Sequence, residues 1–359
     1  MRAPRYGTRA LTEVLPSALA ALDGRDNPLD LPAQTQVVVV VVDGLGHRQL
    51  LEAADELPTL GPAVRAQAPI DAAFPTTTPA GVATIALALP PGRHGMVGAT
   101  FELPDFGVVL NPLHWEDDPP PFAVQTEPNV FSRAVGIRVL SHGPVGYARS
   151  GMTRTLLGSA EQRGYERFGA AAIEAGRRRL DYVYLPELDK VGHGEGPLTG
   201  PWRQCLRGID ALVGRILQRL PDTASVLLTS DHGMVRIPDD HRIDADDPLL
   251  QAGVRVMAGE PRMRQLYCDD PLAIRERWSQ VLQGRATVLL RNEALALGLF
   301  GEYDDMIIDR IGDVIAVAQD DWAMASALVD AKPSGLRGMH GALTDAELLV
   351  PCLLLPGVA

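Results

Sequence analysis

Apolar runs alternate with amphipathic stretches along most of the chain. The strongest run is VVVVVV at residues 37–42, where six β-branched side chains follow one another without polar alternation. Such a run is typical of a strand that is covered on both faces, as in the parallel sheets of α/β proteins. Similar apolar runs begin at Ala134, Leu180, Ala224 and Leu348.

Helical periodicity fills the spaces between these runs. Residues 47–57, 164–180 and 201–220 place apolar side chains at intervals of three and four, which predicts amphipathic helices. Alternating strands and helices predict an α/β fold, a three-layer sandwich with a central, mostly parallel sheet. We expect residues 1–359 to form one domain.

Two regions break this alternation. Residues 101–133 are rich in proline and acidic residues, which predicts a long excursion over the surface. Residues 240–335 hold short helix-like and strand-like stretches without a clear place in the sheet order. We expect this second region to be a smaller accessory cap or lid inserted within the domain.

Composition narrows the range of partners. The net charge of −12 leaves no basic footprint, which argues against binding to a nucleic-acid duplex. No apolar run is long enough to cross a bilayer, and the first twenty residues make a poor secretory signal, so we expect no membrane partner and a cytoplasmic location. The three cysteines are scattered, which indicates neither a disulfide framework nor a thiolate metal site.

Carboxylates and imidazoles follow several of the apolar runs. Asp43 comes directly after residues 37–42, and open α/β sheets bind their ligands beyond the carboxyl ends of the strands. The alternative for such an aspartate is a turn or a helix cap. The comparable candidates in the other runs and near the C-terminus are Asp189, His193, Asp231, His232 and His340.

Three aspartates and three histidines without sulfur suit zinc or a similar first-row divalent ion. Six donors exceed one tetrahedral site, so the sequence predicts two metal ions. Asp189 and His193 are four residues apart, as on one helical turn, so both side chains could reach one ion. Taken singly, each residue could instead be a capping aspartate or a satisfied core histidine, but their recurrence after successive strands favours metal binding.

A threonine triplet precedes a further predicted helix in FPTTTPAGVATIALAL. Pro79 stands where proline is tolerated at the start of a helix, and a hydroxyl there faces a ready anion site. The alternative role for Thr77 or Thr78 is to cap the helix. Beside a divalent cation, a threonine hydroxyl becomes an activated nucleophile.

With these motifs the chain resembles the alkaline phosphatase superfamily, and within it the type I phosphodiesterase/nucleotide pyrophosphatase family. The matching motifs, in the family's order, are VDGLG, FPTTTPAGVATIALALPPGRHGMVG, LDKVGHGEGP, SDHGM and GMHG. The sixteen-residue step from Thr78 to His94 equals the family's step from its nucleophile, which selects Thr78 over Thr76 and Thr77.

The resemblance implies a division of the metal ligands. One ion is expected at Asp189, His193 and His340, and the other at Asp43, Asp231, His232 and Thr78. It also implies an alkaline phosphatase-like fold and hydrolysis of phosphodiester or nucleotide pyrophosphate bonds in a small-molecule substrate, through a phospho-threonine intermediate. Zinc is the expected metal, with manganese or iron as alternatives.

The sequence departs from the family pattern after HGMVG, where members often carry an asparagine that helps to bind a phosphoryl oxygen. Ala99 stands there, and Thr100, Arg149 and Arg154 are the candidate replacements. The family's Phe-Pro-Asn after the nucleophile is also altered, to Pro79-Ala80-Gly81, which leaves the leaving-group preference open.

Three alternatives to the diesterase stay open. A phosphomonoesterase or a phosphonate hydrolase could use the same metals, although a monoesterase usually needs extra cations and Lys190, the one lysine near the motifs, is expected to point to solvent. A non-catalytic protein that binds a phosphorylated ligand is made plausible by Ala99, but retention of all six donors and of Thr78 favours an enzyme. The sequence does not predict an oligomeric state.

Overall fold

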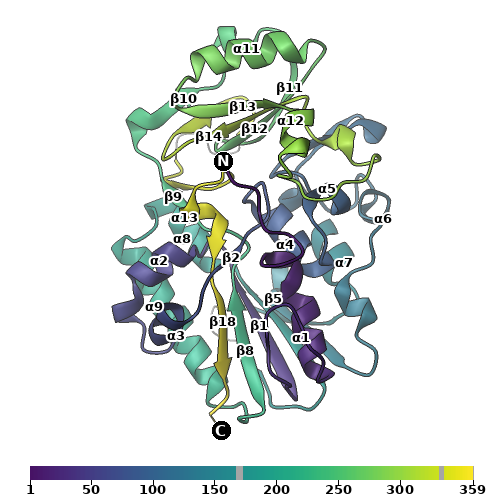
Figure 1. Cartoon of the computed structure of the whole chain (residues 1–359), viewed down its shortest axis with the longest axis vertical. Coiled ribbons are helices and arrows are strands. Elements are labelled where there is room, and N and C mark those ends of the chain that lie inside the picture. The colour runs from purple at the N-terminus through teal and green to yellow at the C-terminus, as the bar shows by residue number, and fades with distance from the viewer. Residues whose placement is uncertain (167–172, 331–334, 359) are drawn as a thin grey trace.

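The computed structural model describes residues 1–166, 173–330 and 335–358. Its main feature is a six-stranded sheet in the order β18-β8-β1-β7-β5-β6. In that order the strands span Cys352–Pro356, Ala224–Thr229, Gln36–Val42, Arg179–Leu185, Arg138–Pro144 and Glu161–Tyr165. Strands β18, β8, β1 and β5 of this sheet are labelled in Figure 1. Neighbouring strands run parallel except for β18, which is antiparallel to β8. The prediction of a mostly parallel α/β sheet is confirmed.

The valine run forms β1 at the centre of the sheet and is buried along its whole length. Because side chains alternate across a strand, its even-numbered valines enter one core and its odd-numbered valines the other. The helices over the first core are α2 (His47–Glu52), α3 (Leu60–Ala66) and α9 (Gly200–Leu217), and those over the second are α1 (Val14–Leu22) and α4 (Thr78–Leu87). These are the three expected layers.

Several predicted boundaries shift. β5 begins at Arg138, four residues after the start of its apolar run, because Gly136 with φ of 71° turns the chain first. The run that begins at Leu348 divides into the short β17 (Leu349–Val350), which pairs with β2 (Ile70–Asp71), and β18. The predicted helix at 164–180 is wrong at both ends, which belong to β6 and β7, and residues 167–172 lie outside the described residues.

Residues 101–133 are more than a surface excursion. They form the hairpin of β3 (Phe101–Leu103) and β4 (Val108–Leu110), followed by the short α6 (Pro121–Val124). Trp115 is only 2% exposed, and its indole N–H donates to the carbonyl of Pro119 at 2.7 Å. The next helix, α7 (Gly151–Leu157), begins against the Trp115 ring, so this apolar side of the segment belongs to the core.

A second, antiparallel sheet occupies much of the region expected to be a cap. Its order is β11-β12-β14-β13, with bounds Val254–Glu260, Met263–Cys268, Val314–Ala318 and Ala286–Leu290. Helix α11 (Pro271–Val281) packs on one of its faces, and side chains of the other face share a core with α4. Figure 1 shows this sheet beyond the carboxyl ends of the parallel strands. Its role as a lid stays a prediction.

The remaining elements are short connections. The helices are α5 (Pro91–His94), α8 (Glu187–Glu195), α10 (Pro248–Gln251), α12 (Arg291–Ala296) and α13 (Asp345–Leu348). The strand pairs are β9 (Val235–Arg236) with β16 (Gly338–Met339) and β10 (Arg242–Asp244) with β15 (Ala323–Ala325). In the described parts of the chain, every helix is too short or too polar to cross a membrane.

Candidate metal centre and nucleophile

The carboxyl ends of three neighbouring strands bring the candidate ligands together. Asp43 follows β1 directly, and Asp231 and His232 come just after β8. Asp189 and His193 lie on α8, the helix that follows β7. Since β8, β1 and β7 are adjacent and parallel, these segments leave the sheet at one edge.

Asp43, Asp231 and His232 form one buried group whose ligand atoms all lie within 4.8 Å of one another. His232 Nε2 is 3.4 Å from Asp43 Oδ1 and 3.8 Å from Asp231 Oδ2. The other ring nitrogen, Nδ1, is 3.0 Å from the carbonyl of Gly233. Because a carbonyl only accepts, we assign the proton to Nδ1, and the Nε2 lone pair then faces the two carboxylates.

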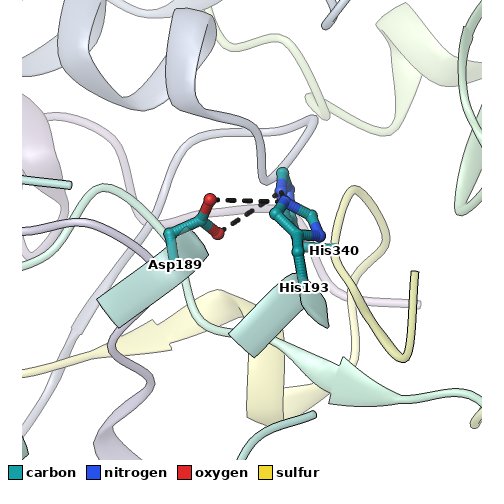
Figure 2. Close-up of side chains that lie close together, drawn as sticks. All are labelled: Asp189, His193 and His340. Carbon is teal, nitrogen blue, oxygen red and sulfur yellow. Dashed lines mark hydrogen bonds and ion pairs between the residues drawn. The ribbon is translucent and has the colours of Figure 1, made fainter. Parts of the chain in front are cut away.

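Asp189, His193 and His340 form a second group within the same 4.8 Å limit (Figure 2). His193 Nε2 is 3.3 Å from Asp189 Oδ2, and His340 Nε2 is 3.8 Å from Asp189 Oδ1. The rings of His232 and His340 are stacked with their centroids 3.8 Å apart, so the two groups adjoin. The structure thus brings together all six donors, in the division that the family resemblance implies.

The hydrogen bonds of the second group leave two lone pairs facing each other. The Nδ1 atoms of His193 and His340 each lie 2.8 Å from a carbonyl, that of Gly338 and that of Thr76 respectively. Both Nδ1 atoms therefore carry the proton, and the two Nε2 atoms are only 3.3 Å apart. Two imidazole lone pairs at this distance repel unless a cation lies between them or one ring is protonated.

Carboxylate oxygens without hydrogen-bond partners also indicate that cations bind here. Asp189 Oδ1 and Asp231 Oδ2 are buried and have no hydrogen-bond partner among the described residues. Burial raises the pKa of Asp43 well above its usual range, and the charges of Asp231 and Asp189 raise it further. Burial lowers the pKa of His340, which favours the neutral imidazole that binds metals. The donor set therefore fits two divalent cations.

The three threonines before Pro79 have three different environments. Thr77 caps α4, because its hydroxyl accepts from the amide of Ala80 at 3.4 Å. The hydroxyl of Thr76 donates to the carbonyl of Ala342 at 2.8 Å and accepts from the amide of Gly341 at 2.9 Å. Thr78 is left to face the first group, with Oγ1 3.4 Å from Asp43 Oδ1 and 3.2 Å from His232 Nε2.

The altered residues after Thr78 allow close packing at this site. A Cβ atom on Gly81 would lie 2.6 Å from the carbonyl oxygen of Asp231, so only glycine lets the first turn of α4 approach the segment after β8 this closely. Gly44 has φ of 73°, and a Cβ there would lie 2.9 Å from Asp189 Oδ1. The absence of a side chain at Gly81 and Gly44 therefore lets their backbone pack directly against Asp231 and Asp189, two of the candidate ligands.

A cavity of about 570 Å³ opens beside Thr78, Asp43 and Asp189. Its lining includes Arg149 but neither Thr100 nor Arg154. The Thr100 hydroxyl exchanges hydrogen bonds with the backbone of Gly259 on β11, and the Arg154 guanidinium lies 2.9 Å from Asp117 Oδ1. Of the three candidates to replace the asparagine, only Arg149 therefore lines the cavity that Thr78 faces.

Lys190 is exposed and also faces the cavity beside Thr78. Its Nζ lies 5.5 Å from the centre of the Tyr147 ring. The expected exposure to solvent is therefore confirmed, and α8 additionally presents Lys190 at the cavity beside Asp189.

Tyr184 is a site residue that sequence reasoning missed. Its hydroxyl donates to Asp43 Oδ2, which leaves Asp43 Oδ1 facing Thr78 and His232. Burial raises the pKa of Tyr184 well above its usual range, so the hydroxyl keeps its proton. The signal in the sequence was a hydroxyl near the end of the apolar run LDYVYL, and Tyr184 is the second-last residue of β7.

An ion pair between the second sheet and the main domain was also missed. Arg262, in the turn between β11 and β12, lies 2.8 Å from Glu347 Oε2, and both side chains are fully buried. Glu347 Oε1 accepts from the amide of Ala342 at 3.0 Å. The carbonyl of Ala342 also accepts from the Thr76 hydroxyl. The ion pair of Arg262 and Glu347 therefore helps to hold in place the segment that carries His340.

The family assignment follows from comparison with known proteins. The model of the type I phosphodiesterase / nucleotide pyrophosphatase family matches residues 37–343, which include every candidate ligand and Thr78. The chain belongs to this family. Its members are hydrolases of phosphoester bonds, and the chain is an enzyme of that class.

Solved structures of this family share the fold. Murine ectonucleotide pyrophosphatase/phosphodiesterase 5 aligns with a TM-score of 0.66 at 17% identity, covering 90% of this chain and 88% of its own. An inactive threonine-to-alanine variant of the murine protein, in complex with AMP, aligns equally well. The human protein gives a TM-score of 0.64 at 18% identity, over 89% of this chain and 87% of its own. No curated protein matches the sequence.

Proposed function

We propose that this family member hydrolyses phosphodiester or nucleotide pyrophosphate bonds in small molecules, through a phospho-threonine intermediate on Thr78. The observation that carries the proposal is the position of Thr78 Oγ1, 3.4 Å from Asp43 Oδ1 and 3.2 Å from His232 Nε2. The neighbouring structure that holds AMP is a relative of this chain, which supports a nucleotide-like substrate.

Two divalent cations are part of this proposal. Asp43, Asp231, His232 and Thr78 would hold one, and Asp189, His193 and His340 the other, with zinc favoured by the nitrogen and oxygen donors. Manganese and iron are the alternatives. When bound, such cations lower the pKa of a coordinated hydroxyl and offset the charge of the phosphoryl group.

The chain's own residues position the reaction. Thr78 Oγ1 attacks phosphorus in line, so the bond from Oγ1 to phosphorus forms while the bond to the leaving oxygen breaks. Thr78 is the first residue of α4, so its amide lacks an intrahelical acceptor and can bind a phosphoryl oxygen. Water then cleaves the phospho-threonine, which releases the second product and restores the hydroxyl.

A phosphomonoesterase is the second candidate, because Lys190 and Arg149 at the cavity could offset the additional charge of a monoester. Turnover of p-nitrophenyl thymidine monophosphate and of p-nitrophenyl phosphate, with and without zinc, separates the two. We expect zinc-dependent turnover with the diester preferred. A preference for the monoester would contradict the diesterase, and absence of turnover would favour a non-catalytic protein that binds a phosphorylated ligand.

A further inference from the structure

Two cations without salt bridges stand at the cavity beside Thr78. Lys190 and Lys332 are the only lysines in a sequence that otherwise uses arginine. Within the described residues, Lys190 and Arg149 are exposed and form no salt bridge, whereas other exposed arginines, including Arg2, Arg48, Arg138 and Arg207, are paired. Lys190 interacts electrostatically with the carboxyl of Glu187 but forms no direct salt bridge with it. A cation that lines a cavity and has no direct salt bridge can pair with a ligand.

Lys190 and Arg149 stand in otherwise acidic surroundings. The chain carries a net charge of −12, and Asp43 and Asp189 already line the cavity. Glu116 is the one other carboxylate in the lining, and its side chain forms no salt bridge with either cation among the described residues. Apart from the two proposed metal ions, an anionic ligand that enters this cavity therefore meets Lys190 and Arg149 as the side chains that attract it.

The rest of the lining suits an organic group. Trp115, Met152 and Leu156 are buried apolar residues, and the rings of Tyr147 and Tyr184 lie 6.4 Å apart at the same cavity. A volume of about 570 Å³ exceeds what one phosphoryl group needs and is ordinary for a small organic ligand. The cavity thus combines an apolar interior with cationic groups and a reactive hydroxyl.

We propose that the substrates are phosphoesters whose organic group fills this cavity and carries a second anionic group, bound by Lys190 and Arg149. Phosphate and carboxylate share the required chemistry, since a lysine offers a point charge and an arginine a bidentate fork for either. The orientation, with the scissile phosphoryl at Thr78, rests on the proposed function.

Binding to the zinc-loaded Thr78→Ala protein tests this directly, because no turnover is needed. Adenosine 3′,5′-bisphosphate is compared with AMP, and 3-phosphoglycerate with glycerol 3-phosphate, by titration calorimetry. We expect the ligand with the second anion to bind about tenfold more tightly in at least one pair. The pair that shows the difference identifies phosphate or carboxylate as the second group.

Variants of Lys190 and Arg149 then show whether these two side chains cause the difference in affinity. Lys190→Gln and Arg149→Gln should remove most of the difference within the pair, with a larger loss of affinity for the ligand that carries the second anion than for its partner, and Lys190→Arg should retain the difference. Arg215→Gln on α9 is the matched control, because Arg215 is exposed and outside the cavity. Equal affinities within both pairs, or variants that weaken all four ligands alike, would overturn the inference.

The two proposals fail separately. Zinc-dependent turnover in the unaltered protein without discrimination between the paired ligands would refute only the second anionic group. Discrimination without turnover would refute the hydrolase proposal and leave the anion site standing. Absence of binding by all four ligands would overturn this inference as well.

Discussion

Adjacent threonines at the start of α4 differ in what their hydroxyls contact. Thr76 binds backbone groups of Gly341 and Ala342, Thr77 caps the helix, and Thr78 faces Asp43 and His232. The sequence allowed either Thr77 or Thr78 to be the cap, because both precede the same helix. The distinction depends on contacts with residues that are distant in the sequence, such as His232, which lies 154 positions from Thr78.

Substitution of these threonines should therefore have opposite effects on activity and stability. Thr78→Ala should lower kcat by about a thousandfold or more, since the nucleophile is lost, with little change in the free energy of unfolding. Thr77→Ala should cost about 1 kcal/mol of stability through the lost cap and keep most of the activity. Turnover and urea unfolding of both variants check this, and an active Thr78→Ala protein would refute the nucleophile.

The hydroxyl of Tyr184 fixes one oxygen of Asp43. Tyr184→Phe removes only this hydrogen bond, so we expect zinc affinity to fall by about ten- to a hundredfold while the fold is retained. Competition with a chromophoric chelator measures the affinity. Tyr182→Phe is the matched control, because the Tyr182 hydroxyl is buried without a hydrogen-bond partner among the described residues. Equal affinities in the two variants would show that Tyr184 does not position Asp43.

Individual elements could be predicted from their own residues, but the pairing of distant elements could not. The valine run predicted β1 because six successive apolar, β-branched residues are typical of a strand that is buried on both faces. The pairing of the second sheet could not be predicted from local pattern, since β12 pairs with β14 about fifty residues later in the sequence. The residues of a short strand do not indicate which other strand it pairs with. Arg262 and Glu347 were missed for the same reason, being 85 positions apart.

The buried pair of Arg262 and Glu347 joins the β11-β12 turn to α13. Arg262→Met or Glu347→Gln should each lower the free energy of unfolding by about 3 to 5 kcal/mol, because the remaining partner stays buried without its counter-ion. The double substitution Arg262→Met with Glu347→Leu should recover part of the loss. Urea unfolding of the three variants measures this coupling, and additive losses in the double variant would contradict it.

The whole molecule carries a buried histidine that links stability to pH. Burial lowers the pKa of His94 to about 3, with a smaller effect of Arg310. The unfolded chain binds a proton there below about pH 6.5 and the folded chain does not, so stability should fall as pH decreases from 6.5. Between pH 6.5 and 5 this contribution is about 2 kcal/mol.

His94→Gln should therefore make the free energy of unfolding less dependent on pH in that range. Urea unfolding at several pH values compares it with the unaltered protein and with His114→Gln, a change at an exposed position outside the core. An identical pH dependence in all three proteins would contradict the assignment to His94.

Six donors from distant segments of the whole chain meet at one edge of the sheet, and the central claim is that they hold two cations. Anomalous diffraction at the zinc edge from zinc-loaded crystals tests this most directly. We predict two peaks about 3.5 to 4 Å apart, one at Asp189, His193 and His340 and the other at Asp43, Asp231 and His232, with Thr78 Oγ1 bound to the latter. A single peak, or peaks away from these residues, would contradict the account.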